Sequence, residues 1–274
     1  MNYTDERMEK LHGVLLEIFE YIKDVCEQND LTYLVIAGTA LGAYRHGGFI
    51  PWDDDLDIAL PRGDYEKLLK ILHDIKHPLY EIQDESNEKG YFLPFVKVRK
   101  KNTVFREAVA PFLYERNGIF IDIFPIDTED RIDTFDFKMR SFLIKLLNHA
   151  LCVKNCREYY KDRRSRGKYL VDRITSLPFC FFSNRKLLHM QKKLMTARNH
   201  KSAIYAVNYA STYSINKEAM PYEVYFPVKK ITFEGKETYS YGNIENYLTR
   251  IYGNYMELPP EEKRHTHEPF ELKF

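Results

Sequence analysis

Two aspartates, Asp55 and Asp57, stand one residue apart in the run Asp-Asp-Asp-Leu-Asp-Ile. In a β-strand, side chains two residues apart point to the same side, so the two carboxylates would converge on one point. Carboxylates that close repel each other and are costly to bury. A hard divalent cation removes both costs, because Mg²⁺ prefers a few carboxylates together with phosphate oxygens. The pair therefore predicts a site for Mg²⁺, with Mn²⁺ as an alternative, beside a phosphate-bearing substrate.

The strand that would carry this pair is predicted from the apolar residues between the acids. Leu56, Ile58 and Leu60 alternate in phase, as the buried partners of a real strand do. On this pattern Asp53 joins the metal side if the strand begins early enough, and Asp54 faces away. The alternative is a solvated acidic turn after the preceding proline, and the alternation argues against it.

A two-metal site needs a third carboxylate, and Asp122 supplies one inside the apolar run Ile-Phe-Ile-Asp-Ile-Phe-Pro. A lone charge in such a strand is hard to explain as packing. Asp122 is therefore predicted as the third ligand and as a candidate base, two roles that the sequence does not separate. Asp127, beyond the proline, is expected to cap a loop.

An anion site is predicted one helix ahead of the paired acids. Gly38 and Thr39 lie between an apolar strand at Tyr33–Ile36 and a short helix expected at Thr39–Arg45. The backbone N–H groups at a helix N-terminus are free and the helix dipole favours an anion, so a phosphate is expected to rest on this turn. Many strand–helix turns carry glycine for geometry alone, so the prediction depends on the position of this turn, one helix ahead of Asp55 and Asp57.

Basic side chains near these motifs are candidates for binding a diphosphate. Lys97 and Arg99 alternate on a predicted strand, so both are expected to face a cleft, with a solvated sheet face as the alternative. Arg45 follows the short helix, where either a phosphate or the helix dipole accounts for it.

The remaining elements follow from periodicity, and their order indicates an α/β or α+β sheet core. Helices are expected at 5–29, 63–73 and 244–252, strands at 92–98, 103–106 and 118–124, and a hairpin at 222–239 that turns at Glu234-Gly235. Residues 131–200 have long helical patterns at 135–160 and 183–199. We interpret 1–130 and 201–274 as the catalytic core and 131–200 as a helical insertion or subdomain.

Composition narrows the class of protein. The 41 basic residues nearly cancel the 40 acidic ones, so the chain lacks the basic excess expected of a nucleic-acid-binding protein. No signal-peptide pattern is present, and the longest apolar run, Leu177–Phe182, is too short to cross a bilayer. The four scattered cysteines are typical of free thiols in a reducing compartment, so the cytoplasm is favoured.

Two further features of the helical segment have competing explanations. The basic stretch Lys154–Arg173, followed by the apolar run, is suited to peripheral contact with the inner membrane face, although a solvated helical face is the simpler alternative. His149, Cys152 and Cys156 share one helix face and would need Cys180 to complete a zinc site; buried helix cysteines are the commoner outcome.

The motifs together resemble a known family. Gly-Thr before a helix, a DxD strand and a distant third Asp are similar to the nucleotidyltransferase superfamily of the polymerase-β type. More closely, residues 37–42, 49–57 and 120–125, and the tail 252–260 with Arg264 and His267, resemble the LicD family. That family includes bacterial phosphocholine transferases acting on teichoic acids and lipopolysaccharide, and it is similar to the fukutin-related ribitol-phosphate transferases. The similarity is concentrated in 33–125 and 222–267.

The resemblance favours an α+β fold with a mixed sheet, and it implies a polymerase-β-like core, a CDP-linked donor (usually CDP-choline) and a sugar hydroxyl of a glycan or lipid-linked glycan as acceptor. Asp55, Asp57 and Asp122 would hold Mg²⁺ on the donor's diphosphate, CMP would leave, and Arg264 and His267 would belong to the site. CDP-ribitol, CDP-glycerol and CDP-ethanolamine remain open as donors. Alternatives are NMP transfer with pyrophosphate release, a DxD glycosyltransferase, and a non-catalytic glycan- or nucleotide-binding module.

Overall fold

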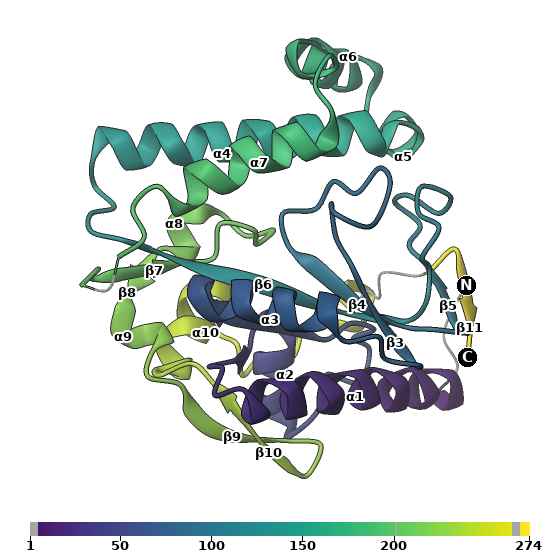
Figure 1. The fold of residues 1–274 in the computed structure, drawn as a ribbon, viewed down its shortest axis with the longest axis vertical. Helices are drawn as coiled ribbons and strands as arrows, with labels where there is room; N and C mark the ends of the chain where they lie inside the picture. Colours follow the sequence, from purple (N-terminus) through teal and green to yellow (C-terminus); the bar gives the residue numbers. More distant parts are fainter. Residues whose placement is uncertain (1–4, 201, 265–268) are drawn as a thin grey trace.

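The computed structural model describes residues 5–200, 202–264 and 269–274. Within these ranges the main sheet has seven strands, ordered β1-β2-β6-β4-β3 and extended from β6 by β7 and then β8 (Figure 1). The strands are β1 (Leu34–Val35), β2 (Asp57–Pro61), β3 (Tyr80–Gln83), β4 (Val96–Lys100), β6 (Phe120–Glu129), β7 (Tyr205–Val207) and β8 (Met220–Pro221). β2 runs parallel to β6, and the other neighbours are antiparallel. The mixed sheet agrees with the predicted mixture of α and β structure.

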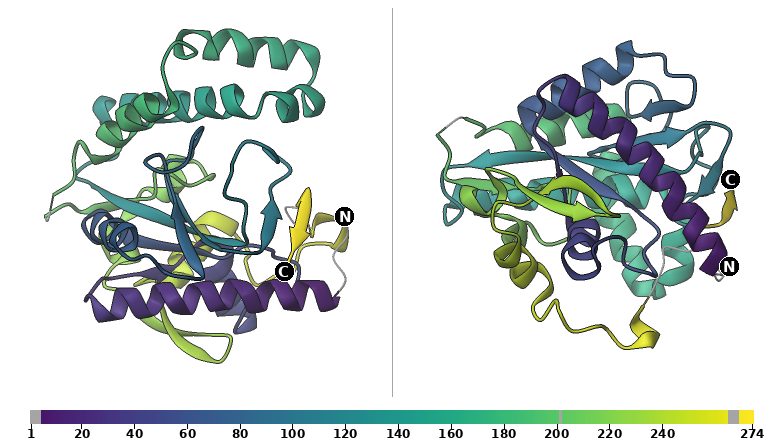
Figure 2. Two further views of the ribbon diagram at one scale, coloured as in Figure 1. Left: turned by 45° about the vertical axis from the view of Figure 1, so that its right-hand side comes forward. Right: turned by 90° about the horizontal axis from the view of Figure 1, so that it is seen from below.

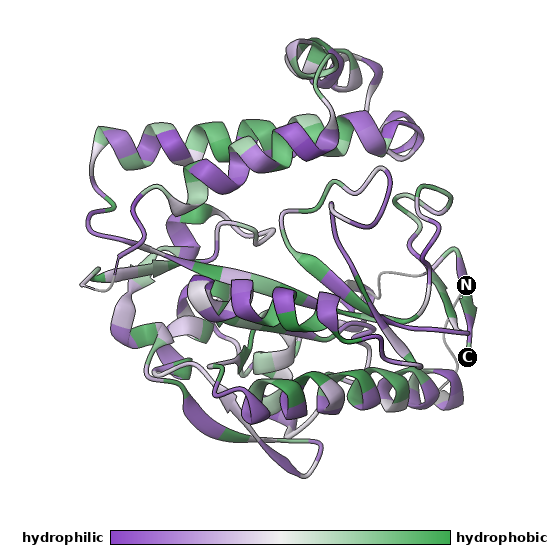
Figure 3. Cartoon of the chain, in the orientation of Figure 1, coloured by the Kyte–Doolittle hydropathy of each residue, from purple (hydrophilic) through white to green (hydrophobic). Residues whose placement is uncertain are grey.

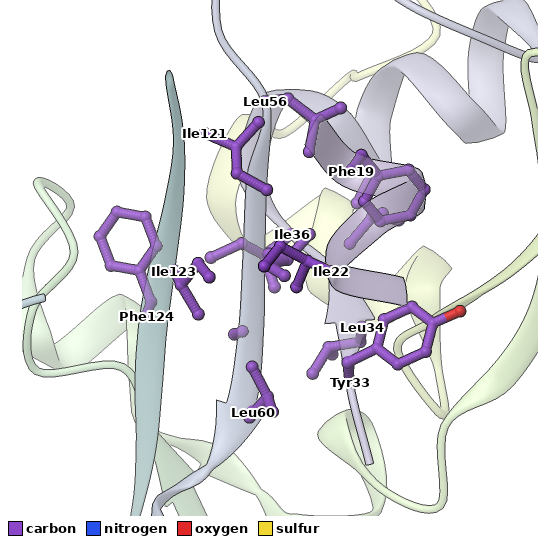
Figure 4. Close-up of a cluster of buried hydrophobic side chains, with 14 of the residues drawn as sticks. Phe19, Ile22, Tyr33, Leu34, Ile36, Leu56, Leu60, Ile121, Ile123 and Phe124 are labelled. Atoms are coloured by element: carbon purple, nitrogen blue, oxygen red, sulfur yellow. The ribbon is translucent and has the colours of Figure 1, made fainter. Parts of the chain in front are cut away.

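The centre of the sheet has one apolar face and one mixed face. Ile121 and Ile123 of β6 point toward Phe19 and Ile22 of the first helix, whereas Phe124 points to the opposite side (Figure 4). Because side chains alternate along a strand, Asp122 shares the side of Phe124. The hydrophobic core thus lies on one side of β6, and the predicted third acid lies on the other.

Three helices of the N-terminal half pack around this sheet: α1 (Asp5–Gln28), α2 (Ala37–His46) and α3 (Arg62–Asp74). α1 buries Leu11, Leu15 and Ile18 at helical spacing, runs across the sheet (Figure 2) and contacts β4 and β6. Apolar and polar bands recur along it (Figure 3), as expected of a helix with apolar residues every three to four positions. The predicted helices at 5–29 and 63–73 are confirmed.

A layer of helices stands on the other side of the sheet from α1 (Figures 1 and 2). It contains α4 (Phe135–Asn155), α5 (Arg157–Arg163), α6 (Arg166–Ser176), a 3₁₀ turn (Leu177–Phe179) and α7 (Asn184–Thr196). Arg140 of α4 forms a 2.7 Å ion pair with Glu129 at the end of β6, which ties the layer to the sheet. The helix predicted over 135–160 is broken at Cys156, whose backbone is not helical (φ −111, ψ 38). The division into a core and an inserted subdomain stays a prediction.

The C-terminal part holds smaller elements beneath and beside the sheet. They are α8 (Ile215–Glu218), α9 (Tyr222–Tyr225), β9 (Lys229–Phe233), β10 (Lys236–Ser240), α10 (Ile244–Tyr252), a 3₁₀ turn (Glu261–Lys263) and β11 (Glu271–Lys273), which pairs with β5 (Val104–Arg106). The β9–β10 hairpin turns at Glu234 and Gly235, both with positive φ, as predicted. The predicted final helix and its end at Gly253 are also confirmed.

Several strand boundaries differ from the sequence prediction. The hairpin expected over 222–239 begins only at Lys229, because residues 222–225 form the short helix α9. β2 begins at Asp57 rather than Asp53, and β4 begins at Val96 rather than Phe92. β6 continues through Pro125 to Glu129. Proline lacks a backbone N–H, but the pairing with β4 ends opposite Ile123, so β4 needs no hydrogen bond from position 125.

This extension of β6 also corrects the expectation for Asp127. The residue lies inside the strand, fully buried, and is not a loop cap. It accepts two hydrogen bonds from Arg62 (2.8 and 2.6 Å) and one from Asn199 (2.6 Å). Asp127 therefore forms a structural ion pair with Arg62 that joins α3 to β6.

No helix in the described part of the chain has the length and apolar character needed to span a membrane.

Candidate active site

A cavity of about 1130 Å³ opens over the mixed face of β2, β6 and β4. Its walls come from segments far apart in the sequence: residues 36–37, 51–57, 93–97, 105–109, 120–124, 159–163, 208–218, 247 and 264. The acidic motif and the predicted third acid therefore meet in one hollow. The helical layer also reaches it, through Tyr159 and Arg163 of α5.

A row of three charged side chains lies on neighbouring strands in this cavity. In the sheet register Asp57 is opposite Asp122, and Asp122 is opposite Lys97 on its other side. The Lys97 ammonium donates to both carboxylate oxygens of Asp122 (2.9 and 3.2 Å) and lies 3.5 Å from Glu107. Lys97 is only 1% exposed. Strand pairing thus brings together Asp57 and Asp122, which are 65 positions apart, and adds a buried cation.

The electrostatics of these acids are those of crowded negative charge. Burial raises the pKa of the Asp57 carboxyl well above its ordinary range, and the carboxylates of Asp55, Asp122 and Asp53 raise it further. Burial also raises the pKa of Asp122 to about 6, although the Lys97 ammonium acts to lower it. A bound cation would favour the ionised form of both groups.

The segment ahead of β2 differs in detail from the prediction. Asp55 lies in an irregular stretch before the strand, yet it lines the cavity with Asp57. Asp54, expected to face away, is buried and also contributes to the lining. His12 of α1 fixes this stretch from behind: its Nε2 lies 2.7 Å from the Asp53 carbonyl oxygen, and its ring stacks on Phe49. Because the stretch is not a strand, the alternation argument does not apply to Asp54.

Gly38 and Thr39 lie in the first turn of α2, which begins at Ala37, and serve to position the acids. The Thr39 hydroxyl accepts the backbone N–H of Asp57 (2.9 Å). A Cβ atom at position 38 would lie 2.7 Å from Asp53 Oδ2, so the glycine makes room for that carboxylate. Ile36 and Ala37, at the start of the helix, line the cavity, whereas Gly38 and Thr39 do not.

The predicted phosphate-binding cations divide into two groups. Lys97 lines the cavity, but Arg99 does not: it is buried and donates to Gln83 and to the Gly118 carbonyl, at 2.6 Å each. Arg45 donates to the Tyr255 carbonyl oxygen (2.7 Å) and thereby holds the C-terminal tail. Arg99 shares the face of Lys97, since both lie over the Phe120 ring and near Glu107, but its bonds to Gln83 and Gly118 hold it outside the lining of the cavity.

The C-terminal tail reaches the cavity through Arg264. Its guanidinium lies 4.7 Å from the centre of the Trp52 ring, and both residues line the hollow. His267, the other tail residue predicted for the site, lies outside the described residues.

The donor set suits a hard divalent cation by chemistry. Asp55, Asp57 and Asp122 offer only carboxylate oxygens, the ligands that Mg²⁺ and Mn²⁺ prefer, and their mutual repulsion is the cost that such an ion relieves. Among the residues that the structure describes, however, no three Asp, Glu, His or Cys side chains form a metal-binding group. The three aspartates do not form such a group, since Lys97 holds Asp122, and neither do the cysteines of the helical layer.

Comparison with known proteins agrees with the motifs. Residues 30–146 match the family model described as LicD/FKTN/FKRP, nucleotidyltransferase domain. The chain is 27% identical over 258 residues to the lipopolysaccharide cholinephosphotransferase LicD of Haemophilus influenzae, covering 93% of each chain. Residues 30–146 therefore carry a LicD domain. Uncharacterised proteins of Rickettsia prowazekii and Rickettsia typhi are 38% and 39% identical over 94 and 71 residues, or 32% and 25% of this chain and 34% and 23% of theirs.

The LicD domain match spans α2, β2 and β6, and so contains Asp55, Asp57 and Asp122. Other residues of the cavity were missed by sequence reasoning. Glu107 follows a short strand with no motif around it, and Glu218 stands in an ordinary polar helix sequence. Neither has a local sequence signal: Glu107 lies within the LicD match but outside its acidic motifs, and Glu218 lies beyond the match.

Proposed function

We propose that this protein is a LicD-type transferase that moves phosphocholine from CDP-choline to a sugar hydroxyl of a cell-surface glycan, as in a lipopolysaccharide or teichoic acid precursor. The observation that carries the proposal is the row formed by Asp57, Asp122 and Lys97 in the floor of a large cavity. The match over 93% of the chain to a cholinephosphotransferase supports the same activity. A polymerase-β-like core is part of the proposal, supported by the parallel pairing of β2 with β6 behind the start of α2.

In the proposed reaction the acceptor hydroxyl oxygen attacks the phosphorus that bears choline. The bond from that phosphorus to the CMP oxygen breaks, CMP leaves, and the hydroxyl proton passes to a carboxylate of the site. Asp55, Asp57 and Asp122 would hold Mg²⁺ or Mn²⁺, which would neutralise charge on the donor's phosphates. Lys97 supplies a fixed positive charge beside Asp122 without entering solvent.

Cationic side chains from three separate segments suit an anionic donor. Among the described lining residues the cations are Lys97, Arg163 and Arg264. Arg163 comes from the helical layer and Arg264 from the tail, so closure of both segments around the donor would exclude water from the cavity.

The direct test is to follow CMP release from purified protein with Mg²⁺ and a mixed glycan acceptor. CDP-choline, CDP-ethanolamine, CDP-ribitol and CDP-glycerol are compared, with EDTA as the metal control. We expect CMP from CDP-choline, loss of the signal with EDTA, and a fall of at least about 100-fold in Asp57→Asn and Asp122→Asn. Asp74→Asn, an exposed acid at the end of α3, is the matched control.

Other outcomes of this assay contradict the proposal. CMP from CDP-ribitol or CDP-glycerol alone would replace choline with a polyol. Pyrophosphate release from a nucleoside triphosphate, with no CMP from any CDP-linked donor, would make the protein a nucleotidyltransferase. Silence in both assays would favour a non-catalytic binding module.

We also propose that the protein works in the cytoplasm, and that the helical insertion at 131–200 contacts the inner membrane face, where a lipid-linked acceptor would lie. α6 stands outermost in the helical layer (Figures 1 and 2) and leaves Leu170 and Ile174 60% and 61% exposed. Basic residues flank them, at Arg166, Lys168 and Arg173. This mixture fits a surface rich in anionic lipid.

Co-sedimentation with vesicles tests the membrane contact. We expect binding to vesicles that contain about one-third phosphatidylglycerol, and weaker binding after the double change Leu170→Ser and Ile174→Ser. Vesicles of phosphatidylcholine alone control for the charge. Equal recovery with both vesicle types and both proteins would contradict the contact.

A further inference from the structure

A buried carboxylate outside the aspartate row, Glu218, also lines the cavity. It ends the short helix α8 and is 1% exposed. Its Oε2 accepts a 2.8 Å hydrogen bond from the Tyr225 hydroxyl. In the described residues no Lys, Arg or His forms an ion pair with it, so a buried acid faces the hollow without a protein cation. Burying an acid in this way is costly, and a cationic ligand would offset the cost.

Tyrosine rings line the same part of the cavity. Tyr213 and Tyr247 both contribute to the lining. Each ring is fixed from behind: Tyr213 meets Tyr252 edge-on at 5.7 Å, and Tyr247 stacks on Tyr241 at 3.7 Å. Both rings are therefore held in place before a ligand binds, and Tyr213 is the more accessible, because Tyr247 is only 1% exposed.

The tyrosines connect Glu218 with the aspartate site. Burial raises the pKa of Tyr213, and the carboxylates of Glu218 and Asp57 both raise it further. Burial raises the pKa of Tyr247 well above its ordinary range, and its causes again include Glu218 and Tyr213. Tyr213 therefore lies within electrostatic reach of both acids, so a group bound at Glu218 is a neighbour of the floor of the cavity.

We propose that Glu218, Tyr213 and Tyr247 form the subsite for the quaternary ammonium of the donor, so that the group transferred is a cationic alcohol phosphate and not a polyol phosphate. The inference rests on the proposed function. Aromatic faces attract a quaternary ammonium through their quadrupole, and the buried carboxylate supplies the opposite charge. The phosphate, two carbons from the nitrogen in phosphocholine, would then lie toward Asp57.

The hydrogen bonds already made by Glu218 favour choline over ethanolamine. The carboxylate accepts from Tyr225 and from the Ser211 hydroxyl. A trimethylammonium group has no N–H to donate and needs no free lone pair, whereas the three N–H donors of a primary ammonium would compete with Tyr225 and Ser211 for the same carboxylate.

Calorimetric titration with two donors of equal phosphate charge tests the subsite apart from catalysis. CDP-choline and CDP-glycerol are each titrated into the protein with Mg²⁺, and the ratio of their Kd values isolates the head group. We expect the protein to bind CDP-choline at least about tenfold more tightly. Tyr213→Leu and Glu218→Gln should each reduce that preference by about tenfold and leave the Kd for CDP-glycerol within about twofold.

Two further variants separate recognition from folding. Tyr213→Phe keeps the aromatic ring, so its ratio of Kd values for CDP-glycerol and CDP-choline should be about tenfold larger than that of Tyr213→Leu. Tyr222→Leu, a partly exposed tyrosine that does not line the cavity, is the matched control and should retain the preference of the parent protein.

The outcomes distinguish this inference from the proposed function. The subsite would be overturned if the parent protein bound both donors with equal affinity, or if Tyr213→Leu lost the same affinity for both. The proposed phosphotransfer would then still be tested separately by the CMP assay. Binding of neither donor would overturn the proposed function and the subsite with it.

Discussion

Replacing Lys97 with Met should destabilise the protein far more than an ordinary lysine substitution does. Lys97 is 1% exposed, donates to both oxygens of Asp122 at 2.9 and 3.2 Å, and lies 3.6 Å from the centre of the Phe120 ring. Met keeps an unbranched apolar chain and removes the terminal ammonium with its charge and hydrogen bonds. Removing one partner of a buried ion pair costs about 3–5 kcal/mol, because the other charge is left buried and unpaired.

The measurement is urea unfolding at about pH 7.5, followed by circular dichroism, with the free energy of unfolding taken by linear extrapolation. Lys100→Met on the same strand is the matched control: its partner Glu17 is half-exposed, and surface pairs contribute about 0–1 kcal/mol. We expect a loss of about 3–5 kcal/mol for Lys97→Met and less than about 1 kcal/mol for Lys100→Met.

A double-mutant cycle makes the reasoning refutable. Asp122→Asn removes the charge that Lys97 balances, so the double variant should recover at least about 1 kcal/mol relative to the sum of the single losses. Strict additivity of the two changes, or equal losses at Lys97 and Lys100, would show that the buried ion pair does not contribute as the geometry indicates.

Three other predictions follow from named contacts. Burial raises the pKa of Glu218 from 4.5 to about 7, so the folded protein favours the protonated acid. The free energy of unfolding should therefore fall by about 3 kcal/mol as the pH rises from about 5 to 8. Glu218→Gln should lack this fall, and parallel pH profiles of unfolding for the two proteins would contradict the prediction. A Cβ at Gly42 would lie 2.5 Å from a backbone oxygen, whereas one at Gly38 meets only a movable carboxylate, so thermal unfolding should show Gly42→Ala as the more destabilising, by about 1–3 kcal/mol. Arg264→Met removes a cation stacked on Trp52, and initial rates should show a KM for CDP-choline raised about tenfold with kcat changed less than about twofold; a fall in kcat alone would argue against a binding role.

The sequence by itself determined the chemical motif and most of the local elements. The period of α1, the turn at Glu234-Gly235 and the end of α10 at Gly253 depend on residues that are near neighbours in the chain, so their patterns predict them. The acids Asp55 and Asp57 were identified by spacing, and the family motifs around them are confirmed by the LicD match.

Only the tertiary structure decided which side chains share the cavity. Lys97 meets Asp122 because β4 and β6 pair in one register, and a shift of one residue would have turned Lys97 to the other face. Arg99, two positions along the same strand, also reaches Glu107, but its bonds to Gln83 and Gly118 keep it out of the cavity lining. Glu218 has no motif and reaches the site through packing of the C-terminal segments. Periodicity reports a residue's immediate neighbours, whereas contacts between distant segments depend on the register and packing of the whole fold.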